Sequence, residues 1–381
     1  MTLKILMFVP KYPFPIIGGM EKQSYLLSSE LINHGVSVSV LSTIFSPEQK
    51  PFEIYKGVKI HRIKLFKNKI ISVIFKIIYI PVFLFFSRNK FDIIHIHQHS
   101  LVGIYTLVIS KIFFFKTVVK LPNLGNKGLL GVSKSFFGYF KILILKLSDA
   151  FIAMTPAHND ELLLLKFSEK KFSSIPNGIK INPLIDNISD NNDNFRFCYI
   201  GRLEKQKGII FLLECWCEIS TKYPNAKLEI CGNGSLKETI TEFIKTNKID
   251  NSVFLSGHTD NVSNVLLRSD VFIITSETEG MSNAILEAMS FGKSIIASNV
   301  GAAKIQLKDN FFNSTFELND KKKLIYLIKK NITDPNFRIT NANINYNRSL
   351  VFDINNIAKQ YKELYFDIKL GHRLKKVNYD Y

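Results

Sequence analysis

The sequence predicts an α/β protein made of two doubly wound domains in tandem, which face each other across a cleft. Three observations lead to this fold class. Short apolar runs alternate with amphipathic segments along the chain, a rhythm typical of parallel sheets covered by helices. A turn-rich segment at residues 182–194 interrupts the rhythm, which then starts again. The length of 381 residues also suits two domains.

In the first half, the segment Met20–Gly35 has apolar residues at helical spacing and ends at a glycine, a common helix stop. The apolar runs around it are expected to be buried strands at 4–10, 36–43, 92–97, 151–154 and 173–176. Ligands of such sheets bind at the carboxyl ends of the strands, so the residues that follow these runs are the candidates for a site.

The domain boundary is expected at the segment that begins with Asn182-Pro183, because Asp186–Asn194 holds three Asp and four Asn. Residues 1–182 are thus predicted to form the first domain and residues 195–350 the second. In the second domain, strands are expected at 195–200, 226–231, 253–256, 271–275 and 294–297, and helices at 209–222, 235–247, 262–268 and 283–291.

The composition excludes several classes of protein. Apolar residues make up 46% of the chain and charged residues 22%, which is typical of a folded globular protein. The four Cys form no C-x-x-C pair, which excludes a zinc module or a disulfide scaffold and favours free thiols in a reducing cytoplasm. The glycines of Gly232-Asn233-Gly234 do not continue into a G-x-G-x-x-G pattern, which argues against an NAD enzyme.

The net charge of +18 is concentrated in the first half, where residues 1–180 hold 24 Lys and Arg against 9 Asp and Glu. Such asymmetry indicates an anionic partner. We do not expect nucleic acid to be this partner, because the sequence has no nucleic-acid-binding motif. Lysines interleaved with Ile and Phe instead favour an anionic membrane surface. The apolar stretch Ile70–Phe86 contains Lys76 and Pro81, so we expect a buried or interfacial helix rather than a spanning one.

Two carboxylates and a helix start follow one strand of the second domain. Glu279 lies in a loop, and Glu287 lies eight residues further on, inside the helix. Both side chains can therefore reach the opening of the same site. Gly280 frees the backbone near the turn, and Ser282 can cap the helix and leave its N–H groups for an anion. In the alternative interpretation, Glu279 is solvated and Glu287 pairs with a surface lysine.

Arg202 and Lys207 flank a turn that follows another strand and ends at Gly208. Arginine offers a bidentate fork to phosphate oxygens and lysine a point charge, so the turn can act as a diphosphate clamp. Basic loops are common, and this pattern alone does not distinguish a clamp from a solvated loop.

Two further motifs lie in the first domain. Gly18 and Gly19 follow its first strand and allow a ligand or backbone to approach closely. His95, His97 and His99 alternate along a strand and can share one face. A metal site is one interpretation of the histidines, but no carboxylate cluster accompanies them, and we predict no metal.

Together these segments resemble the retaining, nucleotide-sugar-dependent glycosyltransferases of family 4, which have the two-domain GT-B fold. The resemblance spans nearly the whole chain and rests on Gly18-Gly19-x-Glu21, Asp92–His97, Pro176-Asn177-Gly178, Gly201-Arg202…Lys207-Gly208 and Glu279…Glu287. The last segment is the most specific, because Leu-Glu-Ala-Met and Gly292 also match. Lys180 stands where the family commonly has Asp, and Asn233 where Asp is frequent, but neither belongs to the clamp.

The resemblance implies a role for each motif. Arg202 and Lys207 would hold the donor diphosphate, and Glu287 would bind the donor ribose. Glu279 and the backbone after it would contact the donor sugar, His97 would lie near the reacting centre, and the diglycine loop would face the acceptor and the phosphate. The implied catalytic residues are His97, Glu279, Arg202 and Lys207. The implied donor-binding residues are Gly18, Gly19, Arg202, Lys207, Gly280, Met281, Ser282, Asn283 and Glu287. No metal or cofactor is implied, since the nucleotide sugar is a substrate.

The resemblance also implies that a C-terminal helix crosses back to the first domain. Ile357, Tyr361, Leu364 and Tyr365 recur at helical spacing, so the segment at about 355–372 is expected to complete that domain.

The expected function is transfer of a hexose or N-acetylhexosamine from a nucleotide-diphosphate sugar to a glycan acceptor, such as a lipid-linked one. Bacterial surface polysaccharide assembly (O-antigen of lipopolysaccharide, capsule or exopolysaccharide) fits this activity. The enzyme is expected in the cytoplasm, held peripherally on the inner face of the cytoplasmic membrane. Two alternatives stay open: a nucleotide-sugar epimerase of the same fold, and an inactive family member that acts as a binding subunit.

Overall fold

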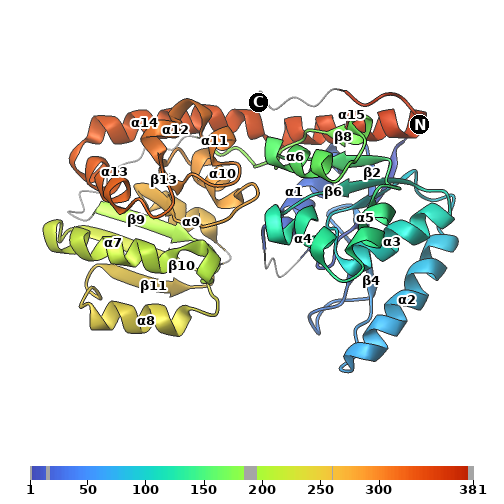
Figure 1. Ribbon diagram of the computed structural model, residues 1–381, viewed down its shortest axis with the longest axis horizontal. Helices are drawn as coiled ribbons and strands as arrows, with labels where there is room; N and C mark the ends of the chain where they lie inside the picture. Colours follow the sequence, from blue (N-terminus) through green and yellow to red (C-terminus); the bar gives the residue numbers. More distant parts are fainter. Residues whose placement is uncertain (1, 14–17, 184–194, 260, 376–381) are drawn as a thin grey trace. The chain divides into compact units, whose positions relative to one another are not determined.

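The computed structural model describes residues 2–13, 18–183, 195–259 and 261–375. The chain divides into two compact units (Figure 1). The first unit consists of Met1–Gly178 and Ile354–Tyr381, and the second of Ile179–Asp353. The turn-rich run Asp186–Asn194, where the domain boundary was expected, lies outside the described residues.

The first unit is built on an eight-stranded sheet with the order β3-β4-β2-β1-β5-β6-β7-β8. All neighbouring strands are parallel except β3 and β4, which form an antiparallel hairpin. Both residues of its turn, Lys56 and Gly57, have positive φ, as a two-residue hairpin requires. The strands are β1 (Lys4–Phe8), β2 (Ser37–Thr43), β3 (Phe52–Tyr55), β4 (Val58–Ile63), β5 (Ile93–Ile96), β6 (Lys116–Lys120), β7 (Ala150–Ile152) and β8 (Phe172–Ser173).

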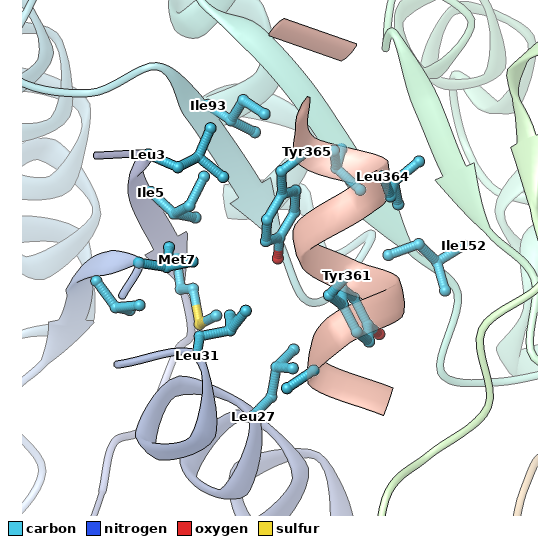
Figure 2. Close-up of a cluster of buried hydrophobic side chains, with 14 of the residues drawn as sticks. Leu3, Ile5, Met7, Leu27, Leu31, Ile93, Ile152, Tyr361, Leu364 and Tyr365 are labelled. Carbon is cyan, nitrogen blue, oxygen red and sulfur yellow. The ribbon is translucent and has the colours of Figure 1, made fainter. Parts of the chain in front are cut away.

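Helices cover both faces of this sheet and bury a separate core on each. One core lies under α1 (Gly19–Asn33) and α15 (Ile354–Leu370). Figure 2 shows Tyr365 of α15 turned toward the side chains of β1, while Leu364 lies on the side of Ile152 in β7. The other core lies under α2 (Lys69–Phe85), α3 (Leu101–Ile112), α5 (Gly138–Leu145) and α6 (Pro156–Leu164). The last helix of the chain therefore belongs to the core of the first unit.

Helix α2 carries a proline in its interior and exposes much of its apolar surface. Pro81 has no N–H for the carbonyl group of Ile77, and the hydroxyl group of Tyr105 donates to that oxygen instead, at 2.7 Å. Ile70 and Phe86, at the two ends of this segment, are each 70% exposed. No helix among the described residues is both long and apolar enough to cross a membrane.

The second unit has a six-stranded, fully parallel sheet with the order β11-β10-β9-β12-β13-β14. Its strands are β9 (Phe195–Ile200), β10 (Ala226–Cys231), β11 (Val253–Gly257), β12 (Val271–Ile274), β13 (Ser294–Ser298) and β14 (Thr315–Phe316). Its helices are α7 (Ile209–Lys222), α8 (Lys237–Thr246), α9 (Val262–Leu267), α10 (Asn283–Ser290), α11 (Ala303–Gln306), α12 (Phe311–Ser314), α13 (Lys321–Thr333) and α14 (Pro335–Ser349). Each element predicted for this half is confirmed within two residues.

The strand predicted at 173–176 was wrong in extent. Strand β8 ends at Ser173. Pro176 has no N–H to continue a ladder, and the next two residues are held by side chains instead. Lys120 donates to the Asn177 side chain, while Gln23 bonds both the N–H and the C=O of Gly178. The chain thus leaves the sheet after Ser173 and is then fixed by side chains of α1 and β6.

Candidate functional site

The strand order of the second unit places its candidate residues at a topological switch point. From β9 the chain moves outward to β10 and β11, and then returns to the other side of β9 at β12. The loops that follow β9 and β12 therefore diverge at the carboxyl edge of the sheet, where open α/β sheets bind ligands. The first loop carries Arg202 and Lys207, and the second carries Glu279.

These two loops are joined by hydrogen bonds. Gly208 has φ +62°, and a Cβ atom there would lie 2.0 Å from the carbonyl oxygen of Thr275, so only glycine permits this approach. The hydroxyl group of Thr275 donates to the carbonyl group of Gly208 at 2.9 Å, and the N–H of Glu277 donates to that of Gln206 at 2.8 Å. The sequence motif ending at Gly208 thus fixes where the β9 loop meets the β12 loop.

Lys207 and Glu279 form an ion pair between the two loops, with both side chains largely buried. The carboxylate of Glu279 also accepts from the hydroxyl group of Ser276 at 2.8 Å. Neither loop alone would hold these groups in place, since Lys207 follows β9 and Glu279 follows β12. The structure therefore brings together two of the residues predicted to act in catalysis.

Arg202 is exposed at the start of the β9 loop, next to the buried ring of Tyr199. The Tyr199 hydroxyl group donates to the Arg202 carbonyl group at 3.4 Å. Burial, and secondarily the charge of Glu279, raises the pKa of Tyr199, while Arg202 opposes this shift. The pKa of Tyr199 thus depends on both Glu279 and Arg202. Because Tyr199 lies in an apolar strand, nothing in the sequence indicated a functional role for it.

The start of α10 is anchored by residues that the sequence did not single out. Ser282 is the N-cap, and its side chain accepts from the N–H of Ile285. The side-chain amide of Gln306 bonds both the N–H and the C=O of Ser282, at 3.2 and 2.8 Å. The carbonyl group of Gly280 accepts from the N–H of Ala302 at 2.8 Å. The segment Gly280–Asn283 is therefore fixed where it enters the helix.

Glu287 lies on α10 and is buried, with 8% of its surface exposed. Met281 and Ser282 are also buried, at 7% and 6% exposure. The backbone around Glu279 and the Glu287 side chain thus belong to one packed corner of the second unit.

The first unit has its own switch point, between β1 and β5. The chain goes from β1 to β2 on one side, and β5 lies on the other side of β1. Gly18 is the N-cap of α1 after β1, and Gly19 is the first residue of that helix. His97 follows β5. The two motifs of the first half therefore flank one point of the sheet, as the second-half motifs do in the other unit.

His97 is buried beside His95, with ring centroids 4.0 Å apart. Nδ1 of His95 is 2.7 Å from the hydroxyl group of Tyr365 in α15. Burial holds the pKa of His97 well below its ordinary value, and the charge of Lys120 lowers it further. His97 is therefore neutral at neutral pH. Its Nε2 atom has no hydrogen-bond partner among the described residues.

The third histidine of the alternating motif does not join the other two. Nε2 of His99 is 3.3 Å from the carbonyl oxygen of Lys127 in the loop after β6. The described ranges contain no group of three His, Cys, Asp or Glu side chains that could hold a metal ion.

Two family descriptions match the chain, one on each half. "Glycosyltransferase Family 4" matches residues 17–182, and "Glycosyl transferases group 1" matches residues 183–349. Among curated proteins, an uncharacterised glycosyltransferase of Methanocaldococcus jannaschii is 30% identical over 59% of this chain and 67% of its own length.

Two further relatives have named activities or pathways. The capsular polysaccharide biosynthesis glycosyltransferase CapH of Staphylococcus aureus is 26% identical over 73% of this chain and 78% of its own. The UDP-Gal:α-D-GlcNAc-diphosphoundecaprenol α-1,3-galactosyltransferase of Escherichia coli is 26% identical over 74% of this chain and 77% of its own.

Solved structures agree in fold across both units. Sucrose-phosphate synthase of Thermosynechococcus elongatus superposes with a TM-score of 0.80 at 17% identity, over 97% of this chain and all of that one. HepE of Anabaena, in complex with UDP and glucose, gives a TM-score of 0.76 at 17% identity, over 95% of this chain and 99% of that one. The fold and its two switch-point sites define a GT-B glycosyltransferase. The chain belongs to the family 4 glycosyltransferases.

Proposed function

We propose that this protein is a retaining glycosyltransferase that moves a hexose or N-acetylhexosamine from a nucleoside-diphosphate sugar to a lipid-linked glycan in bacterial surface polysaccharide assembly. One observation carries the proposal. The loops after β9 and β12 meet at the switch point of the second unit, where they pair Lys207 with Glu279 beside the start of α10. This arrangement brings a cationic group, a carboxylate and backbone N–H groups together at the carboxyl edge of the second sheet.

The residue types suit the departure of a nucleoside diphosphate. When the bond between the sugar C1 and the β-phosphate oxygen breaks, negative charge builds up on the diphosphate. Arg202 and Lys207 offset this charge, and the N–H groups at the start of α10 add to their effect. In this proposal, the carboxylate of Glu279, which is held by Lys207 and Ser276, contacts the donor sugar. Glu287 binds the ribose.

Retention of configuration requires attack on the same face that the leaving group departs from. In the reaction that we propose, the acceptor oxygen forms its bond to C1 as the phosphate leaves, and the hydroxyl proton passes to the departing phosphate oxygen. No side chain is assigned as a covalent nucleophile. In this proposal, His97, which is neutral and buried at the switch point of the first unit, acts as a hydrogen-bonding group near the reacting centre.

The comparisons support the substrate classes. The name of the E. coli relative states a UDP-Gal donor and a GlcNAc-diphosphoundecaprenol acceptor, and that of the S. aureus relative states capsule biosynthesis. A panel of nucleotide sugars, assayed for released nucleotide with and without a lipid-diphosphate-linked sugar, tests the proposal. Nucleotide release that depends on the acceptor supports transfer. Turnover of a nucleotide sugar without an acceptor would instead identify an epimerase, and no turnover with any donor an inactive binding subunit.

We expect chelation to leave transfer intact, because Arg202 and Lys207 supply the positive charge that a metal ion would otherwise provide. The measurement is the transfer rate after dialysis against EDTA, compared with the same sample supplied with Mg²⁺ or Mn²⁺. A complete loss of transfer in EDTA that a divalent ion restores would contradict the metal-independent mechanism.

We also propose that the first unit attaches peripherally to anionic membrane on the cytoplasmic side. Apolar side chains of α2 and its C-cap Phe86 are about half exposed or more, among them Ile70, Val73, Ile74, Ile78, Val82 and Phe86 itself. Helix α5, whose inner side packs on the same face of the sheet, exposes Tyr139 and Phe140, and the turn before it exposes Phe136 and Phe137. A contiguous helix face of this kind is typical of shallow insertion into a membrane interface.

Lysines accompany these apolar groups. From Ile54 to Phe91 the sequence holds nine Lys or Arg and no acid, and from Ile93 to Ser148 it holds seven and no acid. Lys64, Lys67 and Lys69, next to the start of α2, are exposed. Each basic residue near an anionic surface contributes about 1 kcal/mol, and salt screens this attraction.

Replacing Lys64, Lys67 and Lys69 with Glu is therefore expected to weaken co-sedimentation with phosphatidylglycerol liposomes at low salt by at least about tenfold in partition coefficient. Affinity for the donor should not change. Neutral phosphatidylcholine liposomes should bind the unchanged protein much less.

The matched control is Lys321→Glu, Lys322→Glu and Lys323→Glu at the start of α13 in the second unit. It makes the same change in net charge on a helix that belongs to the other unit. Equal sedimentation of the two triple variants would show that net charge, rather than the α2 region, controls attachment.

A further inference from the structure

Lys120 is a buried lysine at the carboxyl end of β6, and only 5% of its surface is exposed. Its Nζ atom donates to Oδ1 of Asn177 at 2.8 Å and lies 5.6 Å from the centre of the Tyr361 ring. In the sheet, Val118 is paired with His95, so the next residues on that face, Lys120 and His97, lie side by side. Lys120 therefore sits at the carboxyl edge of the first sheet, next to the predicted catalytic histidine.

No carboxylate among the described residues forms an ion pair with Lys120. The other largely buried lysine of the candidate site, Lys207, has Glu279 as its partner. A buried charge without an opposite charge is costly, and the usual response is loss of the proton. Burial accordingly lowers the pKa of Lys120 to about 7.

The groups around Lys120 do not neutralise it. Burial holds both His95 on β5 and His97, which follows β5, in the neutral form. On α15, burial raises the pKa of Tyr365, which stays protonated. Burial also lowers the pKa of His158, on α6, to about 3, and the charge of Lys120 contributes to that shift. The surroundings of Lys120 are therefore uncharged near neutral pH.

A purely structural role would not need a cation at this position. A neutral amide could bond to Asn177 without the desolvation penalty of an ammonium group. The Nε2 atoms of His95 and His97, both buried, also have no hydrogen-bond partner among the described residues. Lys120 is thus a cation without a carboxylate partner, and two histidine ring nitrogens near it lack hydrogen-bond partners. Together these groups indicate a ligand that has negatively charged oxygens able to form hydrogen bonds.

We propose that Lys120 is the cation of a phosphate-binding site at the carboxyl edge of the first unit, and that it binds a phosphate of the diphosphate carried by one of the two substrates. The choice of a diphosphate rests on the proposed function. The two sources are the nucleoside diphosphate of the donor and the prenyl diphosphate of the acceptor. His97 completes the site by bonding the same ligand.

Proton uptake on binding tests this site in the unchanged protein. At pH 8 most Lys120 side chains are neutral, and an anionic phosphate beside the amine favours its charged form. Binding of UDP, or of dimethylallyl diphosphate as a soluble prenyl diphosphate, should therefore take up a fraction of a proton approaching one. Calorimetry at pH 8 in two buffers of different ionisation enthalpy measures this number. No proton uptake with either probe would overturn the proposal.

The variant Lys120→Met removes the cation and keeps the length of the side chain. We expect its affinity for at least one probe to fall about tenfold or more and its proton uptake to vanish. The matched control is Lys116→Met, which changes an exposed lysine at the other end of the same strand and should alter neither quantity. Thermal unfolding followed by circular dichroism shows whether the variants are folded. If Lys120→Met does not fold, the proton uptake measured on the unchanged protein still tests the proposal.

The two probes separate the sources of phosphate. If Lys120→Met loses affinity for UDP alone, Lys120 binds the donor. If it loses affinity for the prenyl diphosphate alone, Lys120 binds the acceptor. A loss with both assigns a general diphosphate site, and unchanged affinity for both in folded Lys120→Met would overturn the proposal. Failure here is distinct from failure of the proposed function, because donor binding through Lys207 in the second unit is tested separately.

Discussion

Replacing Lys207 with Ala should weaken binding of the nucleotide sugar by about 1.5–3 kcal/mol, which is roughly 10-fold to 150-fold. The lost contact is a charge-assisted bond from a largely buried ammonium group to phosphate oxygens. The fold should remain intact, because the partner carboxylate of Glu279 keeps its bond to Ser276. Calorimetric titration with the donor found in the nucleotide-sugar panel measures the effect.

Lys205→Ala is the matched control for this prediction. Lys205 lies in the same short 3₁₀ turn as Lys207, but its side chain is exposed. Its removal makes the same change in net charge without touching the ion pair, and donor affinity should change by less than about threefold. Equal losses in the two variants would assign the effect to general electrostatics, and unchanged affinity in Lys207→Ala would remove this residue from the clamp.

Truncation after Asn355 is expected to unfold the first unit and leave the second folded. The deletion removes nearly all of α15, whose buried side chains Ile357, Tyr361, Leu364, Tyr365 and Ile368 belong to one of the two cores of the first unit. A single large-to-small change in a core costs about 2–5 kcal/mol, so several together exceed the usual stability of a domain, about 5–15 kcal/mol.

Hydrogen exchange measured on peptides from each unit distinguishes the outcomes. Strands β1 and β5 should lose protection, while β9 and β12 should keep it. A control truncation after Gly371 removes only residues that follow α15 and leaves this helix whole, so it should leave both units protected. Loss of protection confined to the second unit would refute the assignment of α15 to the first.

The alternation of strands and helices was predictable where each apolar run stood between clear turn residues. This is the case in the second unit, where a Gly, Asn or Asp borders most elements. The β3–β4 hairpin was missed because its turn is Lys56-Gly57 rather than the Asn-Gly pair that identifies such turns in a sequence. Strand β6 was missed because lysine occupies both of its ends.

The motif residues were predictable because each belongs to a short, recognisable segment. The residues that hold them in place were not predictable. Glu279 and Lys207 stand in recognisable motifs, but the ion pair between them depends on two loops that the strand order brings together. Gln306 fixes Ser282 from 24 positions away, and nothing near Gln306 in the sequence indicates this contact. Lys120 looks like an ordinary basic residue until its burial is known.

The discontinuous first unit has a consequence for synthesis on the ribosome. Its last helix is encoded after the entire second unit, so the apolar faces of β1 and α1 that α15 covers stay open while Ile179–Asp353 is translated. At about 5–20 residues per second, this interval lasts roughly 10–35 s. The second unit can complete its own core first. The nascent chain therefore presents an unfinished sheet for many seconds, and chaperone binding to this segment during translation is the expected result.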